Sequence, residues 1–288
     1  MRTFILYGIC SSLAMTIVGA ELRAPHSQLR QKPSQVEVRY SLLAKTITLH
    51  EPVVVLFSIH NGLSSPITLT LGAQKRQFFQ FSLTTPDGQV LQSSFPPAGQ
   101  VDIVTFGSGT QEVAPRGDYQ QRLIMNQWFA FRTVGTYIVK GQLTSGIDVA
   151  GNGSLSTQAQ MISLRIGERN PQRLEKVCAE LTKRVEDSSS VEEWEEPALM
   201  LSYIDDPIAV RYLAQVLSTH KGTENIIVPG LERIADDSAV EVLLSSLSDQ
   251  SGEVSELARR ALARMEPGIS NSHLKETVRR ALTSSPSD

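Results

Sequence analysis

The sequence of 288 residues predicts a multidomain all-β plus all-α protein. An antiparallel β-sandwich over 36–167 is expected to precede a short array of paired helices over 172–284. Short runs with the two-residue period of strands occupy the first half, and apolar residues with helical spacing occupy the second. Composition changes near Asn170-Pro171, where Gly and Thr become scarcer and Leu, Ala and Glu more frequent. We therefore take 168–171 as a linker.

The first 20 residues have the pattern of a secretory signal peptide. Arg2 supplies a positive charge, the stretch from Phe4 to Val18 is apolar or small, and Val18-Gly19-Ala20 suits a cleavage site. The alternative is a transmembrane anchor, although about 15 apolar residues are short for a span of roughly 20. Export to the periplasm or the extracellular space is expected, with cleavage or retention of the segment left open. Residues 21–35 are expected to form a flexible lead-in.

Alternating apolar and polar residues predict the strands of the first domain. Asn61-Gly62 and Pro86-Asp87-Gly88 are turn sequences between them. Candidate strands lie near 36–40, 46–49, 53–59, 67–71, 79–83, 90–91, 101–106, 119–125, 137–143 and 161–166. Roughly eight strands at such spacing, with almost no helical period, indicate an antiparallel β-sandwich.

Two segments of this domain resemble immunoglobulin-like sandwiches. Phe131 to Tyr137 leads from a turn into a strand, which is similar to a tyrosine corner. The resemblance implies that the Tyr137 hydroxyl bonds to the upstream backbone and that Phe131 covers the core beneath the turn; the alternative is an ordinary strand tyrosine. Glu51-Pro52-Val53 through Asn61 resembles the second strand of bacterial immunoglobulin-like domains, which often begins at Glu-Pro and ends at Asn. The resemblance covers 36–167.

The second domain repeats itself at an offset of 30 residues. The recurring residues are Leu201, Ile204, Asp206, Ala209, Val210, Leu213 and Leu217, matched by Leu231, Ile234, Asp236, Ala239, Val240, Leu243 and Leu247. The mostly apolar matches have the spacing of a helix face, which predicts stacked helical hairpins. Asp206-Pro207 is a helix start, and Asp236 or Asp237 is expected to cap the next helix.

Three segments of this domain resemble HEAT-type repeats, including the short bacterial kind: Asp206–Leu213, Asp237–Leu243 and Val254–Leu262. Ser255 stands where the family commonly has Arg after that Val, and family arrays are often longer than the roughly three helical pairs expected here. The resemblance covers about 171–284 and implies a surface for binding another protein.

The formal net charge is −3, and the charged residues are distributed unevenly between the two halves of the chain. Over 21–170, 13 basic and 9 acidic residues give +4, whereas over 171–288, 13 basic and 21 acidic residues give −8. Phosphate neutralisation needs a basic face, so nucleic-acid binding by the helical half is not expected. Cys178 is the one cysteine left after signal cleavage. It is predicted to be a buried helix residue, and the exported fold has no internal disulfide.

No catalytic, cofactor-binding or metal-binding residues are predicted, and no cofactor. The histidines lack the spacing of zinc ligands, and Gly107–Thr110 lacks the lysine of a phosphate loop. The acidic run Glu192–Glu196 is predicted to be a solvated helix face. The pairs Asp205-Asp206 and Asp236-Asp237 are predicted to cap helices rather than to perform acid–base chemistry.

The predicted function is that of an exported, non-catalytic protein-binding or adaptor protein that uses its helical-repeat and sandwich surfaces. A protein partner is expected, with the oligomeric state open. One alternative is an inhibitor or regulator of an exported hydrolase such as a protease, acting through the loops Asn61–Pro66 and Phe95–Gly109. A second alternative is an enzyme whose site lies at the domain junction, with His60, Asp102 and Glu192 as nominal candidates.

Overall fold

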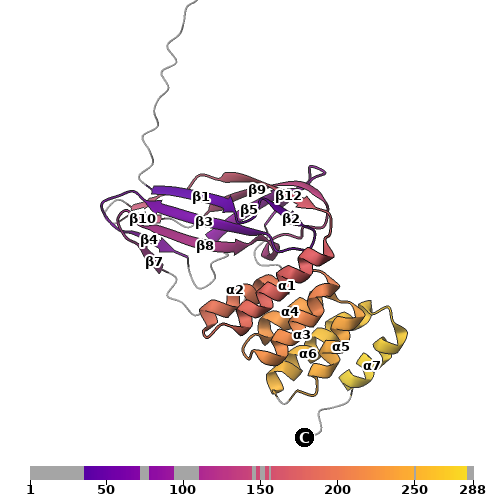
Figure 1. The fold of residues 1–288 in the computed structure, drawn as a ribbon. Coiled ribbons are helices and arrows are strands. Elements are labelled where there is room, and N and C mark those ends of the chain that lie inside the picture. Colours follow the sequence, from indigo (N-terminus) through magenta and orange to yellow (C-terminus); the bar gives the residue numbers. More distant parts are fainter. Residues whose placement is uncertain are drawn as a thin grey trace, which may run out of the picture. The chain divides into compact units, whose positions relative to one another are not determined.

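The computed structural model describes residues 36–71, 78–93, 110–144, 147–149, 153–155, 157–249 and 251–283. Strands occupy Val36–Gly167, here called the strand region, and helices occupy Pro171–Thr283, the helical region (Figure 1). The architecture is therefore β followed by α, as predicted. The predicted signal peptide over 1–20, the lead-in over 21–35 and the strand over 101–106 lie outside the described residues.

The described strands form three sheets. The first has the order β1 (Val36–Leu42), β3 (Val54–Asn61), β8 (Asp118–Ile124). The second has the order β11 (Gly153–Leu155), β10 (Ile147–Val149), β4 (Ile67–Thr70), β7 (Thr110–Val113). The third has the order β2 (Thr46–Thr48), β12 (Gln160–Gly167), β9 (Gly135–Leu143), β5 (Phe79–Thr84), β6 (Val90–Gln92).

Two features of these sheets differ from the prediction. Among the described strands β2 pairs with β12 in parallel, whereas the other pairs are antiparallel. The sequence also missed β7, β10 and β11, which have only three or four residues each. Over so few positions a two-residue period is a weak signal: the equally short β2, β4 and β6 were predicted and these three were not, and their neighbours in the sheet define them.

Aromatic side chains join the first and third sheets into one core. On β3, Val55, Phe57 and Ile59 are buried, as the alternation of side chains along a strand requires. The Phe57 ring lies 4.9 Å from that of Phe79 on β5, in an edge-to-face arrangement. Edge-to-face pairs of this kind add about 0.5–1.5 kcal/mol to the gain from burial.

Tyr137 makes the contact that the sequence predicts. Its side chain is 1% exposed, and its hydroxyl donates to the Thr133 carbonyl oxygen over 2.9 Å. The Tyr137 hydroxyl oxygen in turn accepts from the Thr133 backbone N–H over 3.1 Å. The ring of Phe131, also buried, lies 5.3 Å away. The hydroxyl therefore closes the turn that precedes β9, and the predicted bond to the upstream backbone is confirmed.

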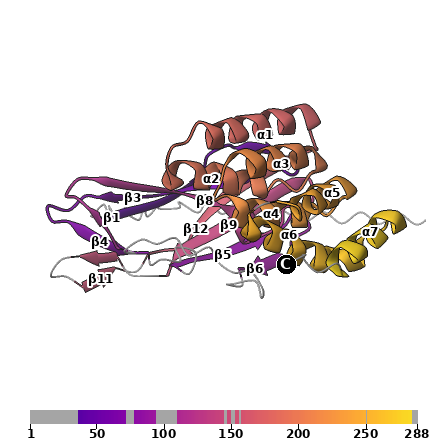
Figure 2. The same cartoon turned by 90° about the horizontal axis from the view of Figure 1, so that it is seen from below.

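The helical region consists of packed helix pairs (Figures 1 and 2). Its helices are α1 (Pro171–Glu186), α2 (Val191–Ser202), α3 (Val210–Thr219), α4 (Glu224–Ile234), α5 (Asp237–Ser246), α6 (Gly252–Met265) and α7 (Ser272–Thr283). The pairs are α1 with α2, α3 with α4, and α5 with α6, and α7 packs on α5 and α6. Successive pairs stack through α2, α4 and α6.

The helix starts follow the predicted capping. The carboxylate of Asp206 accepts from the Ile208 N–H over 3.0 Å at the start of a short 3-10 turn, Pro207–Ala209, that leads into α3. The carboxylate of Asp236 accepts from the Ala239 N–H over 2.8 Å at the start of α5. Of the two candidates for the second cap, Asp236 is therefore the capping residue. Both aspartates accept hydrogen bonds from backbone N–H groups of the first helical turn, which have no carbonyl partner within the helix.

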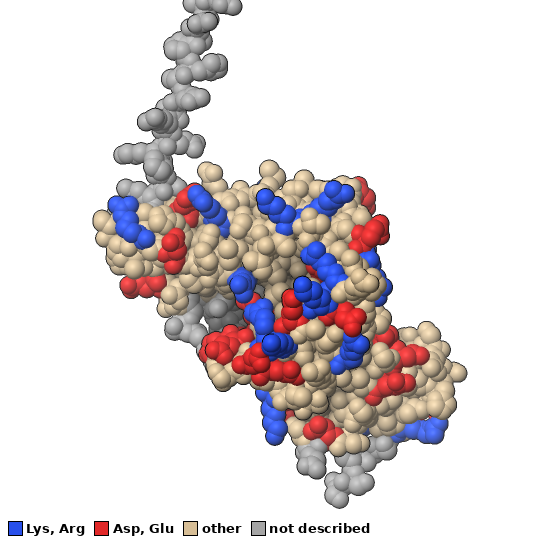
Figure 3. All heavy atoms as spheres, in the orientation of Figure 1, with Lys and Arg blue, Asp and Glu red and all other residues tan. Residues whose placement is uncertain are grey.

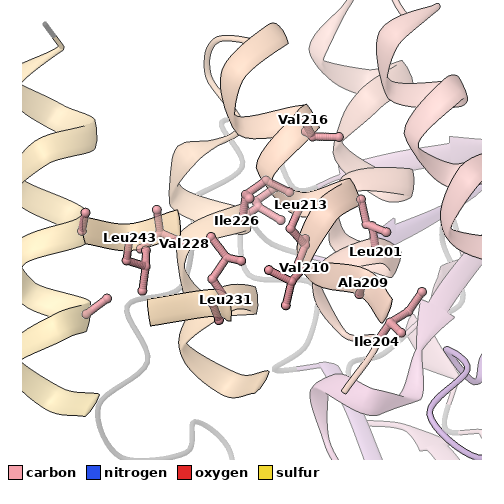
Figure 4. Packing of buried hydrophobic residues seen from close by; sticks show 14 of the residues in the cluster. Leu201, Ile204, Ala209, Val210, Leu213, Val216, Ile226, Val228, Leu231 and Leu243 are labelled. Atoms are coloured by element: carbon pink, nitrogen blue, oxygen red, sulfur yellow. The ribbon is translucent and has the colours of Figure 1, made fainter. Parts of the chain in front are cut away.

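The 30-residue repeat corresponds to equivalent buried positions. It aligns the end of α2 and the following α3 with the end of α4 and the following α5. The buried matches are Leu201, Ala209, Val210 and Leu213 with Leu231, Ala239, Val240 and Leu243. Figure 4 shows Val210, Leu213 and Leu231 gathered between the helices. Each such leucine contributes about 1.5–3 kcal/mol by leaving water, so the repeat records the residues that build the core.

Helix α4 is an addition to the prediction. It contains Pro229 and Gly230, two residues that disfavour helix interiors, and they hid it in the sequence. Burial of Ile226, Ile227 and Leu231 stabilises the helix in spite of them. Gly230 also allows a close approach of α2, because a Cβ at this position would lie 2.9 Å from Cβ of Ser202.

Candidate functional site

An open groove of about 650 Å³ lies between α3 and α5, with one residue of α1 at its edge. We call it the α3–α5 groove. Its lining residues are Glu175, Pro207, Ile208, Val210, Arg211, Ala214, Ser238, Glu241, Val242 and Ser245. Helices α3 and α5 touch less extensively than α2 and α4 or α4 and α6 do. The groove is thus the space left between α3 and α5, which pack less closely than α2, α4 and α6 on the other side of the stack.

The floor of the groove is apolar. Ile208, Ala214 and Val242 are half-buried, and Ile208 and Val242 pack on the hydrophobic core with their inner sides. Their other sides contribute to the groove surface. Packing against the core holds these side chains in place, so the groove is a preformed apolar depression with polar edges. Such surfaces are typical of sites that receive a ligand or a partner side chain.

The charges at the edges are unequal. Arg211 forms an ion pair with Glu175, donates to the Tyr212 hydroxyl over 2.9 Å, and stacks 4.7 Å from the centre of that ring. The hydrogen bond to Tyr212 and the pair with Glu175 raise the pKa of Arg211. On the opposite wall Glu241 is exposed and has no ion-pair partner among the described residues. The groove therefore carries one uncompensated negative charge.

The groove lies where the two copies of the repeat differ. At the 30-residue offset Ile208 corresponds to Ser238, and Arg211 to Glu241. Matched positions such as Val210 and Val240 are buried, and Val210 also borders the groove. The 30-residue pattern predicted the matched positions and gave the others no role. The signal that could have revealed the groove was the set of unmatched positions between the matched ones, because partly exposed helix positions can diversify more than fully buried ones.

A second cleft, of about 440 Å³, includes part of the acidic run on α2. Glu196 pairs with Arg122 of β8 over 2.8 Å and with Arg184 of α1 over 3.6 Å. Glu193 is exposed and accepts from the Ser189 N–H over 2.9 Å, a bond that lowers its pKa. Figure 3 shows acidic side chains gathered near α2 with basic ones beside them. The acidic run is therefore more than a solvated face: Glu196 forms ion pairs, and Glu193 accepts a hydrogen bond at the start of α2.

The nominal catalytic residues are not assembled by the described part of the chain. His60 is the penultimate residue of β3, and its Nδ1 lies 2.9 Å from Oδ1 of Asp118, the residue directly opposite on β8. Both side chains are well exposed, at 48% and 65%, and no described Ser or Cys hydrogen-bonds to either. Glu192 lies on α2 and lines the second cleft, and Asp102 lies outside the described residues. The sequence did not anticipate the His60–Asp118 pair, which the strand register creates.

Cys178 is completely buried in α1. Burial, followed by the nearby charge of Asp206, raises the pKa of its thiol to about 12. The thiolate is the nucleophilic form of cysteine, so this residue packs as a small apolar side chain, as predicted.

No group of three or more His, Cys, Asp or Glu side chains in the described part of the chain is arranged to hold a metal ion. None of the described helices combines the length and the apolar character needed to cross a membrane.

Comparison with known proteins gives no family. No family model matches the chain, and no curated protein matches it. A structural-genomics target of solved structure is 14% identical, covering 46% of this chain and 84% of that one, with a TM-score of 0.27. An alkylpurine DNA glycosylase from Pseudomonas fluorescens is 9% identical, covering 46% and 30%, with a TM-score of 0.25. A sporulation control protein from Bacillus subtilis is 11% identical, covering 52% and 55%, with a TM-score of 0.26. TM-scores this low establish neither a shared fold nor a shared activity.

Proposed function

We propose that this is an exported, non-catalytic protein-binding protein, an adaptor that holds a partner in the α3–α5 groove. The observation that carries the proposal is the groove itself, which is open, has a preformed apolar floor and has polar edges. Its walls carry polar residues that differ between the two copies of the repeat, which suits a recognition surface. Export is proposed from the apolar N-terminal segment, Phe4 to Val18, after Arg2.

The proposal includes the two family resemblances. Paired helices with equivalent caps at Asp206 and Asp236 support a short HEAT-like array. The Tyr137 hydroxyl bond supports an immunoglobulin-like sandwich. Glu51 and Asn61, at the ends of the Glu-Pro to Asn segment, are both buried. Binding folds of these two kinds in one chain favour a role in assembly over a role in chemistry, although fold alone does not define function.

Proximity crosslinking of the tagged full-length protein in its native host, followed by mass spectrometry, tests the proposal. We expect one dominant protein partner whose yield falls several-fold in Ser245→Trp, which places a large ring in the groove. Ser218→Trp is the matched control, because both serines are exposed and each donates to the carbonyl three residues earlier. The absence of a dominant partner for the intact protein, or equal loss in both variants, would contradict the proposal.

A second candidate function is inhibition of an exported hydrolase through the loop Asn61–Pro66. Asn61 is completely buried, and its side-chain amide donates to the carbonyls of Ser65, Val113 and Ala114 over 2.9–3.1 Å. Its side-chain oxygen accepts from the Leu63 N–H over 3.0 Å. The loop is thereby preorganised, which lowers the entropy cost of binding. A panel of exported proteases that all keep full activity in the presence of excess protein would remove this candidate.

A further inference from the structure

We propose that the α3–α5 groove recognises an extended peptide segment that inserts one aliphatic side chain and carries a Lys or Arg beside it. This inference rests on the proposed binding function and specifies the chemistry of the partner. It follows from three properties of the groove: its apolar floor, its uncompensated carboxylate and the hydrogen-bonding character of its α5 wall.

The floor selects an aliphatic side chain. Ile208 and Ala214 on the α3 side face the same opening as Val242 of α5, so an inserted side chain contacts apolar atoms from both helices. Buried anchors of this kind supply most of the binding energy in interfaces. Polar residues surround the floor, so the apolar contact extends over little more than one anchor.

The charge selects a cation beside the anchor. Glu175 and Glu241 contribute two carboxylates to the groove, and Arg211 compensates one of them through its pair with Glu175. Arg211 also donates to the Tyr212 hydroxyl, and no ion pair joins it to Glu241 in the described part of the chain. An incoming Lys or Arg is therefore attracted to Glu241, whereas an acidic residue is repelled. The net charge of −8 over 171–288, from 13 basic and 21 acidic residues, has the same sign.

The α5 wall selects a ligand rich in hydrogen-bond donors. Ser238 uses its hydroxyl hydrogen on Asp236, and Ser245 uses its own on the Val242 carbonyl. Each hydroxyl oxygen keeps lone pairs that accept, and the Glu241 carboxylate is also an acceptor. This wall therefore offers acceptors and needs donors from its ligand. An extended peptide has unpaired backbone N–H groups to supply, whereas a helix uses most of its N–H groups internally.

Fluorescence anisotropy with labelled nonapeptides tests this specificity on the full chain without its N-terminal signal segment. Each peptide carries a central Leu in a Ser/Gly background, with Lys, Ser or Glu at the flanking positions. At low salt we expect the Lys peptides to bind up to about fivefold more tightly than the Glu peptides, the range of an exposed ion pair. Glu241→Gln should remove this preference and Glu241→Lys should reverse it. Ser245→Trp should weaken binding of every peptide.

The controls separate specificity from folding. Glu256→Lys makes the same charge change on α6, outside the groove residues, and should leave the preference intact. Circular dichroism checks that each variant is folded, and Ala214→Trp provides a second block from the opposite wall. Replacing Leu by Ser in the peptide should abolish binding if the apolar anchor is required.

The possible results lead to distinct conclusions. Equal affinity for Lys and Glu peptides, or a preference that survives Glu241→Lys, overturns the inference. Failure of all peptides to bind, while crosslinking still recovers a partner lost in Ser245→Trp, overturns the peptide specificity and leaves the binding function standing. If no peptide binds and crosslinking recovers no partner, the proposed binding function itself is contradicted. Self-association that Ser245→Trp abolishes would assign the groove to a second copy of the chain and also overturn the inference.

Discussion

Asp206 and Asp236 occupy the same position of the repeat and cap equivalent helix starts, yet their surroundings differ. Asp206 is 1% exposed and also accepts from the Arg169 guanidinium over 2.5 and 3.0 Å. Asp236 is half-buried, and no ion pair joins it to a described residue. The caps were readable from residue type and spacing. The partner of Asp206 was not, because Arg169 lies 37 positions away and reaches it only in the folded chain.

Substitution of these two residues should separate the cap from the ion pair. We expect Asp206→Ala to lower the free energy of unfolding by about 2 kcal/mol, since it removes a cap and also the ion pair with Arg169, whose own side chain is 44% exposed. Asp236→Ala removes a cap and the exposed hydrogen bond from the Ser238 hydroxyl but no ion pair, and should cost about 1 kcal/mol. Urea denaturation of both variants measures the difference, and equal losses would show that the ion pair contributes nothing.

The Asp206 carboxylate should make the free energy of unfolding depend on pH. Burial alone would raise the pKa of Asp206, but hydrogen bonds from Arg169 and the Ile208 N–H outweigh it and lower the pKa below its usual value. A lowered folded-state pKa gives stability that is present above the unfolded-state pKa of about 3.9 and is lost as pH falls through the folded-state pKa.

We therefore expect the stability advantage of the natural chain over Asp206→Asn to be larger at about pH 7 than at about pH 2.5. Asn retains the capping oxygen, so the comparison isolates the charge. Urea midpoints at both pH values measure it. An advantage that stays constant with pH would assign the effect to packing.

At the scale of elements, helix pairing depends on small residues as much as on apolar ones. The apolar stripes of α3, α5 and α6 were recognisable from their helical period, as were most strands of five or more residues. Helix α4 was not, because Pro229 and Gly230 lower its intrinsic helix propensity. Its buried face and the space that α2 leaves for Gly230 define it, and both are tertiary properties.

Gly230→Ala should be destabilising although Ala is the better helix former by about 1 kcal/mol. The added Cβ would lie 2.9–3.1 Å from three atoms of Ser202, two of them in the backbone, so α2 and α4 must move apart. We expect a net loss of about 1–3 kcal/mol. Gly252→Ala is the control, because a Cβ there meets nothing within 4 Å. It should be neutral or stabilising by about 0.5 kcal/mol, and a stabilising Gly230→Ala would refute the close approach.

At the scale of the whole molecule, arginine–carboxylate pairs connect the strand region with the helical region. Glu51, which is 5% exposed, pairs with Arg173 of α1 over 2.6 Å. Arg169, just after β12, pairs with Asp206, and Arg122 of β8 pairs with Glu196 of α2. Two of these carboxylates are buried, so loss of an arginine leaves an uncompensated charge. The two regions are therefore expected to unfold together.

The chain offers a direct test because it has only two tryptophans. Trp128 lies in the strand region and Trp194 on α2, so single-tryptophan variants made with Phe report on each region separately. We expect coincident urea transitions in the otherwise natural chain. Arg169→Ala combined with Arg173→Ala should separate them, with the helical region unfolding at a different midpoint. Coincident transitions in this variant would show that the pairs do not couple the regions.

The sequence by itself determined the order of β before α, the matched core positions of the repeat and the two aspartate caps, because these depend on residues close together in the chain or on a regular period. The Tyr137 contact was implied by the resemblance to a tyrosine corner. Only the tertiary structure decided the strands β7, β10 and β11, helix α4, the ion pairs of Arg169 and Arg173, and the α3–α5 groove. These depend on contacts between distant segments and on the space left between packed helices, which no local pattern encodes.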